Sequence, residues 1–357
     1  YLRDRLHHAS FGIIGQRDDA LDPRHRGVLR TFTAIWLLGR ITALAFLLLV
    51  LIPTLLRYAE RAFDAFHDPA DGRADAWDAT AFAAANALLA PWRALTVPRI
   101  DGYAHLPADG RYLLIGNHTT LGLFDVPFLV LGIHEETGVL VRSVGDRQHF
   151  RVPLWRDLLT AFGAFSGTRE NTRARMRAGD PVLIFPGGGR EVARRRGDHY
   201  PLVWRERIGF ARLALEFGYP VVPFAMIGVD DMWDVVADAD DRLYAPARAL
   251  ARRLGIDPDL LFPVVRGLGP TPLPRPQRIY GRIGAPIDAA AFGDAWDDAA
   301  GAARLRDVVR AAVRAGIQEL EAEREEDPDR HLIPRLRDEA LRLTRAQASA
   351  ARRLLRL

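Results

Sequence analysis

The chain has 357 residues, of which 49% are hydrophobic and 26% charged, and this composition excludes a disordered chain, a collagen-like fibre and a bundle of membrane-spanning helices. It contains no cysteine, which excludes disulfides, thiolate metal sites and a cysteine nucleophile. The formal charge is +4, and all 49 basic residues are arginine, so Schiff-base chemistry on a lysine is excluded as well.

The most apolar stretch, Ile35–Leu56, has a borderline length for a membrane-spanning helix. Its 22 residues are interrupted only by Arg40 and Pro53, and a span needs about 20 apolar residues. We expect either a single span or a helix lying in one leaflet, the alternative being a buried core helix. The alanine-rich segment Trp77–Trp92 is expected to pack beside it, so that residues 1–99 form a helical hairpin that anchors the protein to a membrane.

From residue 100 onward, short apolar runs alternate with helical patterns. The expected strands are Tyr112–Ile115, Val139–Val144, Val182–Phe185, Val221–Ile227 and Arg278–Ile283. The helical patterns between them cover Val126–Ile133, Leu154–Phe162, Thr172–Ala178 and Ile208–Glu216. This order predicts an α/β fold for residues 100–300, with a mixed, mostly parallel central sheet flanked by helices.

The C-terminal part carries one break and two helical patterns. Pro263–Pro276 contains five prolines, which predicts no regular structure there. The charged amphipathic patterns Ala302–Arg324 and Leu336–Leu357 predict helices, and residues 301–357 are expected to form a C-terminal extension. The second helix is basic on one side and leucine-rich on the other, so it is expected to pack on the protein or to touch a membrane.

The segment Gly116–Asp125, GNHTTLGLFD, directly follows a predicted strand and holds the first candidate catalytic residues. His118 lies where α/β sheets place their ligands, and an imidazole exchanges protons near neutral pH, as a general base must. A carboxylate at Asp125 can orient that imidazole and stabilise the imidazolium. In the alternative interpretation, His118 is a hydrogen-bonded turn residue, Asp125 caps the helix before Pro127, and another carboxylate such as Asp146 orients the histidine.

The segment Phe185–Glu191, FPGGGRE, follows another buried-type strand. Gly187, Gly188 and Gly189 allow backbone N–H groups to approach an oxyanion or a phosphate, and Arg190 adds a guanidinium. The alternative is a loose turn. A P-loop is excluded because no Gly-Lys-Ser/Thr follows.

Two further segments, Gly163–Arg169 and Val222–Gly228, complete a series of four blocks. In their order and spacing the blocks resemble those of the glycerolipid and lysophospholipid acyltransferase superfamily, over Ile100–Pro286, about half of the chain. The resemblance implies the α/β fold of that superfamily and acyl transfer with His118 and Asp125 as the general-base pair.

Two differences from the superfamily's blocks indicate which branch of the superfamily the chain resembles. The usual His-x4-Asp has six intervening residues here, and Gly187 stands where the glycerophosphate branch has glutamate. The third block is most similar to the branch that includes the acyltransferase region of plant phytyl ester synthases and the mono/diacylglycerol acyltransferase-like proteins. That branch acylates neutral lipid alcohols, which are therefore the expected acceptors.

Substrate binding is expected to involve residues of these blocks. They are Asn117, Thr119, Arg169, Gly187, Gly188, Gly189, Arg190 and Glu191. Residues 142–213 hold 15 arginines against seven acidic residues. This excess of positive charge would suit the phosphates of acyl-CoA, the phosphopantetheine arm of an acyl carrier protein, or anionic lipid headgroups.

The sequence therefore predicts a membrane-associated O-acyltransferase of glycerolipid or neutral-lipid synthesis, at the cytoplasmic face. Its donor would be acyl-CoA or acyl carrier protein, its acceptor a lipid or glycerol hydroxyl, and no cofactor or metal would take part. The acidic run Asp230–Asp241 matches no calcium loop. Nucleic acid is not an expected partner because no aromatic residues interleave with the arginines. Two alternatives stay open: a lysophosphatidate or glycerol-3-phosphate acyltransferase of phospholipid synthesis, and a non-catalytic membrane- or lipid-binding protein on the same scaffold.

Overall fold

The computed structural model describes residues 79–151, 153–253, 257–293, 296–335 and 337. The expected anchor Ile35–Leu56 lies outside these residues, as does all but one residue of Leu336–Leu357. In the described part of the chain, no helix combines the length and apolar character of a membrane span.

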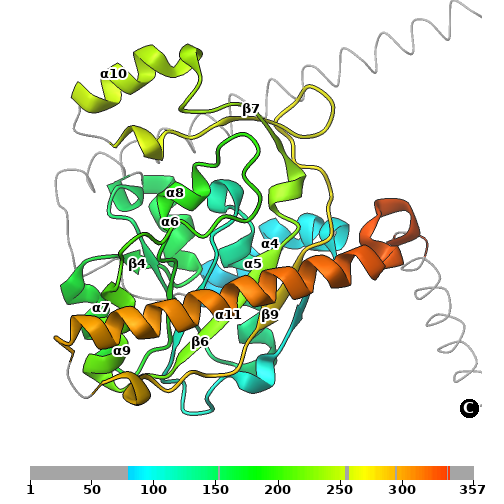
Figure 1. The fold of residues 1–357 in the computed structure, drawn as a ribbon. Helices are drawn as coiled ribbons and strands as arrows, with labels where there is room; N and C mark the ends of the chain where they lie inside the picture. The colour runs from blue at the N-terminus through cyan, green and yellow to red at the C-terminus, as the bar shows by residue number, and fades with distance from the viewer. Residues whose placement is uncertain (1–78, 152, 254–256, 294–295, 336, 338–357) are drawn as a thin grey trace, which may run out of the picture. The chain divides into compact units, whose positions relative to one another are not determined.

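A seven-stranded sheet in the order β1-β9-β6-β2-β5-β3-β4 forms the centre of the described fold (Figure 1). Its strands are β1 (Arg99–Asp101), β2 (Leu113–Gly116), β3 (Arg142–Gly145), β4 (Phe165–Ser166), β5 (Val182–Ile184), β6 (Val221–Ile227) and β9 (Tyr280–Ile283). All neighbouring strands are parallel except β6 and β9. This confirms the predicted mixed, mostly parallel sheet and its five expected strands; β1 and β4 were not expected.

Helices lie on both faces of the sheet. The described helices are α4 (Ala79–Thr96), α5 (Asp125–Thr137), α6 (Pro153–Ala161), α7 (Arg169–Arg177), α8 (Gly189–Val192), α9 (Gly209–Phe217), α10 (Ala245–Arg253) and α11 (Ala299–Glu326), of which α10 stands away from the sheet (Figure 1). Strands β2 and β6 are buried along their whole length. Because successive side chains alternate between faces, Leu113 and Ile115 pack with α9 and α11, while Leu114 packs with α5.

The long helix α11 packs directly on β6 (Figure 1). Its large buried apolar residues belong to the same hydrophobic cluster as one face of β6; they are Leu305, Val309, Val313, Ile317 and Leu320. These buried residues recur every three or four positions along the helix, which is typical of an amphipathic helix that faces a core. In packing, α11 is thus continuous with the sheet that precedes residue 300.

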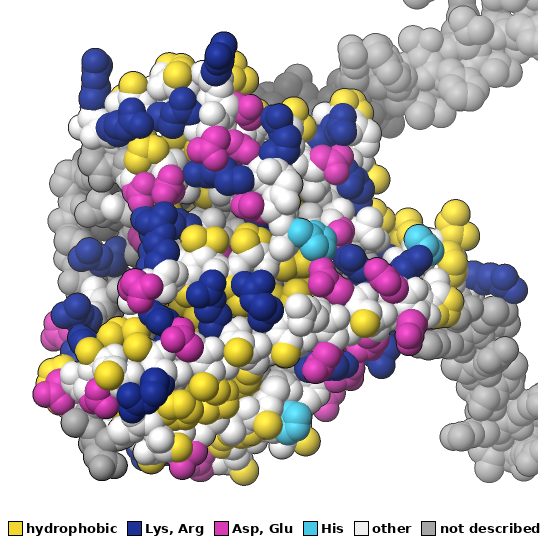
Figure 2. Space-filling model, in the orientation of Figure 1, with side chains coloured by type: hydrophobic (Ala, Val, Ile, Leu, Met, Phe, Trp, Pro, Cys, Tyr) yellow, Lys and Arg dark blue, Asp and Glu magenta, His cyan; other side chains and the backbone are white. Residues whose placement is uncertain are grey.

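A small two-stranded ribbon, β7 (Asp234–Ala237) and β8 (Val264–Arg266), follows β6 together with α10. The prediction of no regular structure over Pro263–Pro276 is wrong at β8. None of the five prolines lies inside β8, so its backbone N–H groups remain available for pairing. Figure 2 shows arginine side chains standing among apolar ones at the α10 end of the molecule.

Candidate active site

Three loops meet at the carboxyl edge of the parallel strands. Because β2 pairs with β5 on one side and β6 on the other, the chain segments that follow these strands lie side by side. They carry His118, the Gly187–Gly189 turn and Asp230, respectively. This is the edge at which open α/β sheets bind ligands.

His118 and Asp125 form a hydrogen-bonded pair. The Nδ1 atom of His118 lies 2.6 Å from Oδ2 of Asp125, whose side chain is fully buried. Burial alone would raise the pKa of Asp125, but the adjacent His118 and the N–H groups of Thr119 and Val126 outweigh it, so the pKa lies below its usual value. The carboxylate therefore stays ionised and fixes the imidazole with Nδ1 toward the protein.

Asp125 contacts His118 and also supports the start of α5, although it is not the N-cap residue of the alternative interpretation. Asp125 is the first residue of α5, and its Oδ1 accepts the N–H of Val126 at 2.9 Å; the N-cap position itself belongs to Phe124. The alternative partner, Asp146, accepts the N–H of Gln148 in the turn after β3. The structure thus places Asp125, not Asp146, against the histidine.

One face of the His118 imidazole is packed against a neighbouring ring, and the Nε2 edge has free space beside it. Phe185 stacks on it with a centroid distance of 4.0 Å and an interplanar angle of 13°. Gly122, at φ +62°, lies beside the Nε2 edge, where a Cβ would sit 3.1 Å from Nε2. Within the described residues Nε2 has no recorded hydrogen-bond partner, so this atom is the one available for proton exchange with a substrate.

Three consecutive backbone N–H groups of the His118 loop donate to three carboxylates. His118 donates to Glu191, Thr119 to Asp125 and Thr120 to Asp230, at 2.8, 2.8 and 2.7 Å. The three acids come from the segments after β5, β2 and β6. The loop is thereby tied to both neighbouring strands.

Glu191 lies inside the protein, not on an open binding surface. It is fully buried, and its second oxygen accepts the N–H of Val203 at 2.8 Å. A Cβ on Gly187 would lie 2.1 Å from Oε1 of Glu191, so the carboxylate fills the space that a side chain at 187 would need. Burial raises the pKa of Glu191 to about 7.

Arg194 and Asp230 form a buried ion pair that the sequence did not reveal as part of the site. Their side chains are 2% and 5% exposed, and the charged atoms lie 2.5 Å apart. Arg194 also donates to the carbonyl oxygen of His118 at 3.2 Å. Asp230 appeared in the sequence only as a member of an acidic run, and Arg194 only as part of a basic cluster.

The glycine turn is held by Arg207. The guanidinium of this exposed residue donates to the carbonyl oxygens of Pro186 and Gly187 at 2.7 and 3.0 Å. The N–H of Gly188, at φ +56°, donates to the carbonyl of Phe185 and is therefore occupied. For Gly187 and Gly189 no such bond is recorded with any residue the structure describes, so their N–H groups are the ones that can face a ligand.

The two arginines expected to bind phosphate lie in different surroundings. Arg190 is paired with Asp257, and its Nε lies 3.7 Å from Asp259. Arg169 is exposed at the start of α7, and no ion pair is recorded for it in the described ranges. The structure therefore does not bring Arg169 to the dyad. A phosphate that binds to Arg190 would have to displace a carboxylate from it.

Asn117 and Thr119 support the loop from inside. Asn117 is fully buried and exchanges two hydrogen bonds with the backbone of Met226, at 2.8 and 2.9 Å, which joins the ends of β2 and β6. Thr119 is also fully buried, and its Oγ1 has no hydrogen-bond partner among the residues that the structure describes. Neither side chain reaches the surface.

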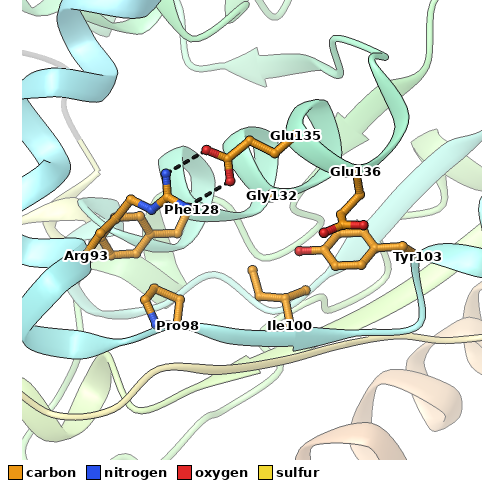
Figure 3. Close-up of a pocket in the computed structure, with 8 residues that line it drawn as sticks. All are labelled: Arg93, Pro98, Ile100, Tyr103, Phe128, Gly132, Glu135 and Glu136. Atoms are coloured by element: carbon orange, nitrogen blue, oxygen red, sulfur yellow. Dashed lines mark hydrogen bonds and ion pairs between the residues drawn. The ribbon is translucent and has the colours of Figure 1, made fainter. Parts of the chain in front are cut away.

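A cavity of about 220 Å³ lies elsewhere, between α4, β1 and α5 (Figure 3). It shares no lining residue with the dyad or the glycine turn. Arg93 and Glu135 face each other there through hydrogen bonds of 2.7 and 2.8 Å, with Tyr103 and Glu136 at the other end. In the part of the chain that the structure describes, no group of three or more His, Asp or Glu is arranged to hold a metal ion.

The region that carries this site is similar to known proteins. Residues 97–227 match the family model described as Acyltransferase. The chain is 29% identical over 256 residues to phytyl ester synthase 2, chloroplastic, from Arabidopsis thaliana, covering 65% of this chain and 35% of that protein. It is 33% identical over 124 residues to the human DGAT1/2-independent enzyme synthesizing storage lipids, covering 35% of this chain and 38% of that enzyme. The chain therefore spans little more than a third of the length of these curated relatives.

Among solved structures, the chain is similar to the crystal structure of the 1-acyl-sn-glycerophosphate (LPA) acyltransferase PlsC from Thermotoga maritima. The TM-score is 0.41 at 15% identity, with 82% of this chain and 98% of that chain covered.

Proposed function

We propose that the chain, whose residues 97–227 match the Acyltransferase family model, is an O-acyltransferase which transfers a fatty acyl group from a thioester to a lipid alcohol. The observation that carries the proposal is the 2.6 Å hydrogen bond from His118 Nδ1 to the buried Asp125, beside the glycine turn. It leaves Nε2 as the free base at the edge of the sheet where ligands bind.

In the proposed reaction, Nε2 of His118 accepts the proton of the acceptor hydroxyl as its oxygen attacks the thioester carbonyl carbon. The tetrahedral intermediate then collapses to the ester, the C–S bond breaks, and the thiolate takes the proton back from the imidazolium. The ionised Asp125 stabilises the imidazolium between these steps. No acyl-enzyme, metal or cofactor is needed for this balance, and the donor would be acyl-CoA or acyl carrier protein.

Charge that develops on the carbonyl oxygen needs hydrogen-bond donors at the transition state. The N–H groups of Gly187 and Gly189 are our candidates, since that of Gly188 is already bonded to Phe185. Arg207 would act indirectly by holding the turn through two of its carbonyl oxygens. Removal of one such donor typically costs about 10²–10³-fold in rate.

A neutral lipid alcohol is the acceptor that we propose. A phosphorylated acceptor would need a cation beside the dyad, and Arg190 is engaged by Asp257 and Asp259. The names of the relatives, a phytyl ester synthase and an enzyme synthesizing storage lipids, agree with this choice. We further propose that the protein works at a membrane surface, where such acceptors are found. The competing assignments are acylation of lysophosphatidate or glycerol 3-phosphate and a non-catalytic lipid-binding role.

The test is acyl transfer from radiolabelled acyl-CoA or acyl carrier protein to a panel of acceptors, with products separated by thin-layer chromatography. His118→Ala should lower the rate by roughly 10²–10⁴-fold, the contribution expected of a general base. Asp125→Asn should lower it by a similar factor, because the amide cannot stabilise an imidazolium. The matched control is His199→Ala, since His199 is an exposed histidine that pairs with Glu321.

Each outcome decides between the assignments. Turnover confined to neutral alcohols supports the proposal, whereas turnover confined to lysophosphatidate or glycerol 3-phosphate replaces the acceptor. If the folded wild-type protein shows no turnover on any acceptor, the result favours the non-catalytic lipid-binding role. Unchanged activity in a folded His118→Ala variant removes His118 from the mechanism.

A further inference from the structure

The β7–β8 ribbon and the residues that flank it expose several apolar side chains. Exposure alternates along the chain from Phe262 to Leu268: Phe262, Val264 and Leu268 are 50%, 52% and 48% exposed, whereas Pro263 and Gly267 are buried. On the partner strand Val236 is 46% exposed. We call these four residues, Val236, Phe262, Val264 and Leu268, the ribbon face.

Pairing and exposure together place these side chains on one side. Asp234 pairs with Arg266, and both are exposed. The register shifts between Val235 and Ala237, so Val264 pairs with the buried Ala237, and Val236 is the extra, exposed residue at this irregularity. The opposite face carries Val235 and Val265, which pair with each other, and Val265 packs on the hydrophobic core. A half-buried ribbon normally turns its polar residues outward, so an outward apolar face indicates a binding surface.

Neighbouring segments extend the ribbon face with further exposed leucines. Leu243 and Leu250 are 76% and 56% exposed, in the turn before α10 and in α10 itself. Tyr244 donates to the carbonyl oxygen of Phe262 at 2.9 Å and thereby ties this segment to the ribbon.

The charge around the ribbon face is positive. Arg242, Arg252 and Arg253 are exposed and have no recorded partner among the residues that the structure describes. Five acidic residues of the same segment pair with arginines: Asp234 with Arg275, Asp240 with Arg195, Asp241 with Arg196, Asp257 with Arg190, and Asp259 with Arg205. The sixth, Asp238, accepts a hydrogen bond from the N–H of Arg196. The surplus is therefore suited to anionic lipid headgroups.

The surface is continuous with the candidate active site. β7 begins four residues after Asp230, which holds the His118 loop. The segment between α10 and β8 reaches the glycine turn through the pairs of Asp257 and Asp259 with Arg190. A bilayer in contact with the ribbon face would thus lie beside the mouth of the site.

We propose that the ribbon face, with the arginines of α10, docks the domain onto the surface of an anionic lipid bilayer and presents the His118 loop to acceptors in it. This inference deepens the proposed function and rests on it for the identity of the acceptor. The docking itself involves only side chains outside the dyad and the glycine turn.

The absence of cysteine allows a direct test in the full-length chain. A single cysteine is introduced as Val264→Cys and labelled with the fluorophore NBD. The matched control is Val308→Cys on α11, a valine of similar exposure, 44%. Both proteins are mixed with phosphatidylcholine–phosphatidylglycerol vesicles that contain nitroxide-labelled lipid, and quenching of each label is measured.

We expect quenching at position 264 and not at position 308, with weaker quenching on pure phosphatidylcholine. Arg252→Gln and Arg253→Gln should each weaken the binding to anionic vesicles by roughly fivefold, a factor that corresponds to about 1 kcal/mol per arginine near the surface. A protein that sediments with the vesicles while the label at 264 stays unquenched would overturn the proposal, as would equal quenching at both positions. A label at 264 that responds to protein concentration but not to lipid would assign the face to a second copy of the chain.

Activity separates this inference from the proposed function. The Phe262→Asp/Val264→Asp variant should lose turnover on acceptors embedded in vesicles by tenfold or more, while retaining turnover on the same acceptor dispersed in detergent. Quenching at 264 with no turnover anywhere would preserve the docking surface and reject the enzyme. Equal loss on both forms of acceptor would show that the ribbon supports the fold instead of the membrane contact.

Discussion

Three carboxylates hold three successive N–H groups of the His118 loop, and this explains why the loop can place an imidazole accurately. Each of His118, Thr119 and Thr120 donates to a different acid, from the segments after β5, β2 and β6. A loop pinned in this way loses little freedom when a substrate binds. The space beside Nε2 of His118 depends on Gly122, because any side chain at this position would lie against the imidazole.

Gly122→Ala should impair catalysis through a steric effect on the imidazole. The new Cβ would lie 2.8 Å from Cε1 and 3.1 Å from Nε2 of His118, so the ring or the loop must shift. We expect kcat to fall by about 10²-fold, in line with the cost of a 1 Å displacement of a reacting group. Gly138→Ala is the control: Gly138 has a similar φ of +73° but no atom within 4 Å of the added methyl group. Similar kcat values for the two variants would contradict the argument.

Glu191→Gln should remove a pH dependence of stability. The pKa of Glu191 is raised by burial from 4.5 to about 7, so between these pH values the folded state holds a proton that the unfolded state has released. The contribution of Glu191 to the free energy of unfolding is therefore complete below pH 4.5 and is lost as the pH rises toward 7. The free energy of unfolding falls over this range by at most about 1.4 kcal/mol per pH unit. Glutamine cannot titrate, so the slope should disappear.

Urea unfolding of both proteins at several pH values measures the difference directly. Because other groups, such as His149, titrate in both proteins, the comparison isolates position 191. A difference in unfolding free energy that stays constant from pH 4.5 to 7 would mean that Glu191 is ionised throughout and that its hydrogen bonds outweigh burial.

At the scale of elements, the Arg194–Asp230 pair joins the segment after β5 to the segment after β6. Asp230→Asn keeps an acceptor for Thr120 but leaves the buried guanidinium of Arg194 without a countercharge, which typically costs about 3–5 kcal/mol. The double variant Asp230→Asn/Arg194→Met should recover part of this loss. The control Asp234→Asn alters an exposed acid on β7 and should change the unfolding midpoint little. Equal shifts for Asp230 and Asp234 would contradict a buried pair.

The elements of the sheet were predictable because each strand is a short, nearly continuous apolar run. The sequence of β6, VVPFAMI, is buried at every position, and its expected bounds agree with the structure. By contrast, β8 was missed because the surrounding prolines outweighed its Val-Val-Arg sequence, and β7 because Asp234 and Val236 turn outward. A run of apolar residues in the sequence indicates a strand that is buried in a core. The strands β7 and β8 are largely exposed, so this signal is weak in their sequences.

The candidate site was predictable where chemistry is concentrated in one segment. His118 and Asp125 are seven positions apart, and the structure brings them together as expected. Partners distant in sequence were not predictable: Arg190 meets Asp257, 67 positions away, and Thr120 meets Asp230, 110 positions away. Glu191 was assigned to substrate binding because sequence alone does not reveal that its carboxylate occupies the space beside Gly187.

At the scale of the whole molecule, the core extends beyond the matched family region. Residues 97–227 match the Acyltransferase model, yet α11, which begins at Ala299, completes the cluster under β6. Contacts near the end of α11 reach back toward the site, since Arg324 pairs with Asp231 at 2.5 Å. We therefore expect the fold to depend on residues far downstream of the family match.

Deletion of residues 299–357 should abolish cooperative folding, whereas deletion of 338–357 should preserve it. The longer deletion removes five buried apolar side chains from the β6 cluster, and each contributes about 1.5–3 kcal/mol when buried. Their combined contribution is comparable to the whole stability of a typical domain, about 5–15 kcal/mol. Urea unfolding followed by circular dichroism and tryptophan fluorescence measures the outcome. If residues 1–298 alone unfold in one sharp transition with an intact dyad activity, then α11 is an appended extension, as the predicted boundary at residue 300 implies, and the packing on β6 adds stability without determining the fold.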